Sequence, residues 1–84
     1  MVRFSIETVF DLPQRSGLLA SGKVTEGVIS AGMVLREEST GLPVRVLGVE
    51  FESPADRRTG RITLLLEREP RSPVARGRTL TGRS

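Results

Sequence analysis

The sequence of 84 residues is long enough for one small domain, and its 37% apolar and 27% charged residues are typical of a globular protein. Cysteine and histidine are absent, which excludes disulfides, thiol catalysis and histidine-based acid–base or metal chemistry. Because no apolar run is long enough to cross a membrane and no signal-like segment opens the sequence, we expect one cytoplasmic domain over residues 1–84.

The basic residues are distributed unevenly along the chain. Thirteen lysine and arginine residues against ten acidic ones give a net charge of +3, and Lys23 is the only lysine. Residues 43–84 hold nine basic and five acidic side chains. Such a basic half is typical of a phosphate-binding surface, but also of a solvated surface with interspersed charges, so both interpretations stay open.

Alternating apolar and polar residues predict a first strand over residues 2–12, with Phe4 and Ile6 on its buried face. Turn-forming residues at 13–17 end this strand. A second strand is expected over 18–28, where Gly22 and Gly27 indicate a bend or a bulge. A short third strand is expected over 33–37.

The second half continues with short strands separated by turns. A turn at 39–41 leads to a fourth strand over 42–52, a polar loop over 53–60, a fifth strand over 61–66 and a closing strand over 78–81. No segment has the 3.6-residue period of a helix. This pattern predicts an all-β fold, a small closed antiparallel β-barrel of six to seven strands. Its expected interior includes Phe4, Ile6, Leu18, Val24, Val46, Ile62 and Leu64.

Several ordered pieces of the chain resemble the second domain of elongation factor Tu and related translational GTPases. The first half contributes residues 6–13 (IETVFDLP), 21–24 (SGKV) and 31–32 (AG). The second half contributes residues 48–50 (GVE), 64–66 (LLL) and 76–77 (RG). The resemblance covers nearly the whole chain and implies the same β-barrel, here as a stand-alone module.

The GTPase part of that family has no counterpart in this sequence. The phosphate loop Gly-x-x-x-x-Gly-Lys-Ser/Thr is absent, so we expect no GTP binding and no cofactor. No histidine is present to activate a serine, and no clustered acidic loop suggests a metal site. We therefore also expect neither catalysis nor a bound metal.

The resemblance implies three residues that contact RNA. The second domain of elongation factor Tu helps to receive the aminoacyl end of tRNA, and the matching positions here are Glu7, Phe10 and Glu50. Each also has a plainer interpretation. Phe10 is in phase with Phe4 and Ile6 and can belong to the barrel core, whereas Glu7 and Glu50 can lie on a solvated strand face.

The residues themselves suggest a second candidate for RNA binding, the basic loop with Arg57, Arg58 and Arg61. Because the chain has only three phenylalanines and no tyrosine or tryptophan, such binding should be led by phosphates, sensitive to salt and weak in sequence preference. We therefore expect a non-catalytic binding module for RNA or the translation apparatus. The alternative is a protein–protein interaction module with no nucleic-acid role.

Overall fold

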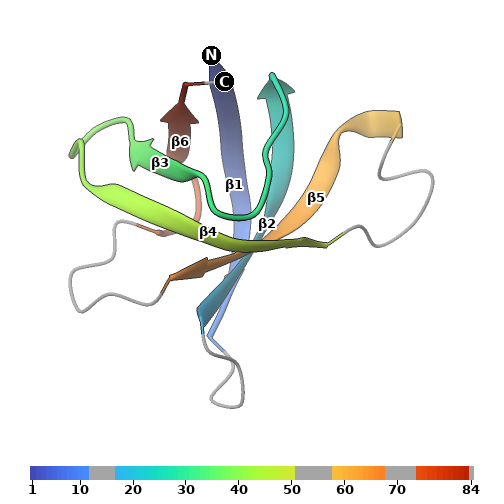
Figure 1. Cartoon of the computed structure of the whole chain (residues 1–84). Coiled ribbons are helices and arrows are strands. Elements are labelled where there is room, and N and C mark those ends of the chain that lie inside the picture. Colours follow the sequence, from blue (N-terminus) through green and yellow to red (C-terminus); the bar gives the residue numbers. More distant parts are fainter. Residues whose placement is uncertain (12–16, 51–57, 68–73, 84) are drawn as a thin grey trace.

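In the computed structural model, which describes residues 1–11, 17–50, 58–67 and 74–83, the chain forms a closed antiparallel β-barrel (Figure 1). The order of strands around the barrel is β1-β2-β5-β4-β3-β6. The predicted fold class is confirmed. The strands are β1 (Val2–Phe10), β2 (Gly17–Glu26), β3 (Val34–Glu37), β4 (Pro43–Glu50), β5 (Arg61–Glu67) and β6 (Thr79–Gly82).

The barrel closes because β1 pairs with β2 on one side and with β6 on the other. The short strand β3 joins β6 to β4, and β5 joins β4 to β2. Closure satisfies the backbone groups that an open sheet of this size would expose at its edges. Among the described residues, no helix is long and apolar enough to cross a membrane.

The interior is filled by the inward-facing side chains of the strands. Six of the seven residues expected inside are buried, and Val24 is partly buried against the same core. The sequence pattern did not single out Leu35 and Leu80, which are fully buried where β3 meets β6. The buried core consists of Val2, Phe4, Ile6, Leu18, Ala20, Ile29, Leu35, Val44, Val46, Ile62, Leu64, Leu66, Val74 and Leu80.

A β-bulge in β1 corrects the expectation that Phe10 belongs to the core. Ile6 pairs with Gly22 and Thr8 pairs with Ser21, so Glu7 is an extra residue with no partner of its own on β2. An extra residue reverses the inward and outward phase of everything that follows it. Val9 consequently packs against the core, and Phe10 is 50% exposed on the outside.

β2 contains the bulge that its glycines indicated, at Thr25, between Gly22 and Gly27. Gly22 pairs in register with Ile6 and Ile62, and the irregularity in β2 comes later, where Thr25 is the extra residue between Val24 and Glu26. Gly22 has a different role. A Cβ at this position would lie 2.0 Å from the carbonyl oxygen of Ser5, so only glycine allows β1 and β2 to approach this closely.

The turn between β3 and β4 is organised by a buried carboxylate. Glu37 occupies an inward position at the end of β3, and its side chain is only 2% exposed. Its oxygens accept hydrogen bonds from the Ser39 hydroxyl at 2.5 Å, the Thr40 amide at 2.6 Å and the Arg78 guanidinium at 3.0 Å. These donors replace the water that burial removes, so the charge is tolerated and fixes the turn.

Candidate functional site

Most of the predicted site residues lie on the outer surface of β1, β2, β5 and β4, which we call the Phe10 face. Strand pairing arranges its outward side chains in rows across the sheet. The central row runs from Thr8 through Ser21 and Thr63 to Glu50. The hydroxyl of Thr63 donates to that of Ser21 at 3.5 Å. Directly paired residues on one face lie about 5 Å apart, so this row is a continuous polar strip.

A charged row borders this strip on one side. The guanidinium of Arg61 lies 2.9 Å from the carboxylate of Glu7, the bulge residue of β1. Lys23 stands between them on β2, exposed and paired with Ser5 and Arg61. The Arg61 charge is therefore largely compensated by Glu7, whereas Lys23 forms no ion pair with any described residue.

An apolar row borders the strip on the other side. Phe10 pairs with Leu19, and Leu19 pairs with Leu65. Leu47, the extra residue of a bulge in β4, is 39% exposed and reaches toward Gly17 at the start of β2. Leu19 is buried without belonging to the interior cluster, which places it on the outside of the barrel under its neighbours.

Of the predicted site residues, the structure brings Glu7 and Arg61 into contact and places Phe10 further along β1, whereas Glu50 lies on β4, three strands around the barrel from β1. Two of them, Glu7 and Arg61, were predicted on separate grounds and form an ion pair. Arg58 is exposed just before β5 and has no ion pair with the described residues. Arg57 lies outside the described residues.

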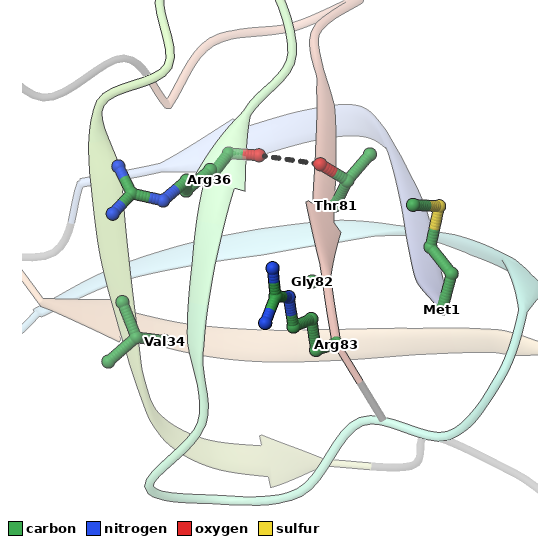
Figure 2. A pocket seen from close by; sticks show the side chains of 6 residues that line it. All are labelled: Met1, Val34, Arg36, Thr81, Gly82 and Arg83. Carbon is green, nitrogen blue, oxygen red and sulfur yellow. Dashed lines mark hydrogen bonds between the residues drawn. The ribbon is translucent and has the colours of Figure 1, made fainter.

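Sequence reasoning missed a second arginine-bearing surface, on β4, β3, β6 and β1. Here a groove of about 520 Å³, the arginine groove, is lined by Met1, Val34, Arg36, Thr81, Gly82 and Arg83 (Figure 2). Arg3 and Arg45 flank it, because they are the strand-register partners of Thr81 and Val34 respectively. The sequence contains part of the pattern that defines this surface. Arg36 and Arg45 each lie between inward-facing residues, but only the order of strands around the barrel shows that these outward positions are adjacent.

The hydrogen bonds around the buried carboxylate of Glu37 stabilise its ionised form. The hydrogen bond from Ser39 lowers its pKa most, those from Thr40 and Arg78 lower it further, and burial opposes them. The resulting pKa is about 2, against an ordinary value of 4.5. A general acid needs a shift in the opposite direction, so this carboxylate acts as a fixed structural anion. Within the described residues, no group of three or more acidic side chains is placed to hold a metal ion.

Comparison of the chain with protein families, with curated proteins and with solved structures found no match. The fold and the two outer surfaces are therefore the basis for the functional proposals that follow.

Proposed function

We propose that the protein is a non-catalytic cytoplasmic module that binds single-stranded RNA, such as the end of a tRNA, on its Phe10 face. The observation that carries this proposal is the exposure of Phe10 on the same face as Lys23. Nucleic-acid binders that read single strands combine an exposed aromatic ring, on which a base stacks, with a basic group that holds the backbone. The resemblance to the second domain of the translational GTPases supports an RNA of the translation apparatus, as an analogy of fold.

The dimensions of the face suit a short segment of RNA. Leu19, beside Phe10, and Lys23 lie four residues apart on β2, which is roughly 13 Å at the rise of an extended strand. Between them lie the hydroxyl groups of Thr8 and Ser21, which can both donate and accept hydrogen bonds, with the buried Thr63 behind Ser21 in the same row. A base on Phe10 would therefore leave its ribose over the hydroxyl row and a neighbouring phosphate close to Lys23.

Binding should be weak and only moderately sensitive to salt. Glu7 compensates Arg61, so, of the residues that the structure describes near this face, Lys23 and Arg58 are the bases that remain for phosphates. Two phosphate contacts to a single strand give a log–log slope of about −1.4 against salt concentration. The charge of this face alone does not support tight or strongly salt-dependent binding.

The test is fluorescence anisotropy with a labelled single-stranded RNA of about ten nucleotides. Replacing Phe10 by alanine should weaken binding by roughly five- to 150-fold, because a stacked base contributes about 1–3 kcal/mol. Replacing Val28, which is exposed but belongs to neither surface, by alanine is the matched control and should change little. Equal affinities for the two variants would contradict stacking on Phe10.

A protein partner is the second candidate, and the two exposed side chains of the apolar row, Phe10 and Leu47, favour it. Exposed aromatic and leucine side chains are typical anchors in protein interfaces. The salt dependence of binding distinguishes a protein partner from an RNA partner. Docking on an apolar row should persist or strengthen at high salt, whereas phosphate-led RNA binding should weaken. A complex that depends on Phe10 and survives high salt would therefore favour the protein partner.

A further inference from the structure

The arginine groove lies on a different part of the barrel from the Phe10 face and has its own chemistry. Arg36 and Thr81 are paired across β3 and β6, and Arg83 follows the end of β6, two residues beyond Thr81. Residues in this diagonal relation have Cα atoms about 7–8 Å apart, within reach of long side chains. Figure 2 shows the Arg83 side chain extending from the end of β6 toward β3, while that of Arg36 extends over β4.

Arg3 and Arg45, which flank this groove, form ion pairs with Glu38 and Glu67, but Arg36 and Arg83 are not compensated in this way. Neither Arg36 nor Arg83 forms an ion pair with the described residues, and no acidic residue lines the groove. The guanidinium of Arg36 donates to the carbonyl oxygen of Gly41 at 2.9 Å, which orients it without neutralising it. Two like charges on neighbouring strands repel each other, so anions bound at both would relieve a real cost.

Apolar side chains border the two guanidinium groups. Val34 is 49% exposed on β3, and the side chain of Met1 is exposed at the other edge of the groove. The groove therefore presents two cationic groups beside apolar surface, in an open hollow of about 520 Å³. A ligand that fits it carries two anionic groups with a less polar body between them.

We propose that the arginine groove is a second nucleic-acid contact, which holds two successive phosphates of a single strand at Arg36 and Arg83. The intervening sugar and base lie against Val34. This inference rests on the proposed RNA-binding function for its ligand class, but it uses residues that the Phe10 face does not contain. Guanidinium groups bind phosphate oxygens through paired N–H donors, and such contacts carry no base preference.

The experiment measures binding of a six-nucleotide oligouridine, labelled at one end, across a range of salt concentrations. Replacing both Arg36 and Arg83 by glutamine should flatten the log–log salt slope by about 1.4, which is a sevenfold difference between about 50 and 200 mM salt. Arg76 is the matched control, because it is an exposed arginine at the opposite end of β6 with no ion pair to the described residues. Its replacement by glutamine should leave the slope unchanged.

Two further probes test which chemical class of ligand the groove binds. An oligothymidine of the same length should bind about as well, because the proposed contacts use phosphates and not the 2′-hydroxyl. A glutamate decapeptide should bind much less well. The proposal is overturned if the double arginine variant keeps the wild-type slope, if R76Q flattens it equally, or if the peptide matches the oligonucleotide. Weaker binding in F10A with the groove slope retained would support both surfaces. An unchanged F10A with a flattened double variant would reject only the Phe10 face.

Discussion

Replacing Phe4 or Phe10 by alanine should affect stability very differently, although both phenylalanines belong to β1. Phe4 is fully buried, and truncating a buried phenylalanine costs about 3–5 kcal/mol through lost burial and the cavity left behind. Phe10 is 50% exposed on the outside, so its truncation removes about half of the burial of one phenylalanine, roughly 1 kcal/mol. In a domain of this size each kcal/mol shifts the melting temperature by about 4–8 °C.

The assay is urea denaturation followed by far-ultraviolet circular dichroism, which needs no tryptophan. The midpoint should fall far more in F4A than in F10A, with similar denaturant dependence in both. If F4A does not fold, the pair F4L and F10L makes the same comparison, with a loss of about 1 kcal/mol for the buried site and almost none for the exposed one. An F10A loss as large as that of F4A would mean that β1 keeps one phase throughout and that Glu7 is not a bulge residue.

Two further predictions test the local structure. Because the folded pKa of Glu37 is about 2, below the ordinary 4.5, its contribution to stability is complete above pH 4.5 and is lost as the pH falls toward 2. E37Q should therefore be less stable at neutral pH and lose less stability on acidification, and identical acid profiles would contradict the role assigned to this carboxylate. G22A should cost about 1–3 kcal/mol in denaturant melts because its Cβ would meet the Ser5 carbonyl, whereas G48A, with its nearest neighbour at 3.8 Å, should stay within about 0.5 kcal/mol. Similar losses in the two glycine variants would argue against close approach at Gly22.

Much of the fold could be predicted because a barrel interior imposes a strict two-residue period. Phe4 and Ile6 in β1, and Ile62 and Leu64 in β5, follow this period and are buried as expected. Strand bounds were less well predicted at their C-terminal ends. The first strand was expected to reach residue 12 and the second residue 28, whereas β1 ends at Phe10 and β2 at Glu26. Apolar residues continue beyond both strands, and alternation alone does not show where pairing stops.

The candidate site was harder to predict because it depends on bulges and on strand order. Val9 and Phe10 are both apolar, so the sequence at this point fits either phase, and only the pairing of Ile6 and Thr8 with β2 shows that the phase reverses. The arginine groove combines residues from the start and the end of the chain with β3. Their adjacency follows from barrel closure through β6, which no local pattern specifies.

The bulge at Glu7 also bears on the proposed binding of nucleic acid. The extra residue turns its carboxylate to the outside, where it compensates Arg61 on the face that exposes Phe10. Through the same insertion, that face gains an exposed aromatic ring, and the guanidinium of Arg61 is no longer an uncompensated charge. The uncompensated guanidinium groups of Arg36 and Arg83 lie elsewhere on the barrel, on a surface that has no exposed aromatic ring among its lining residues. Stacking and phosphate binding are therefore separated, so a bound strand would use both fully only by passing around the barrel from one surface to the other.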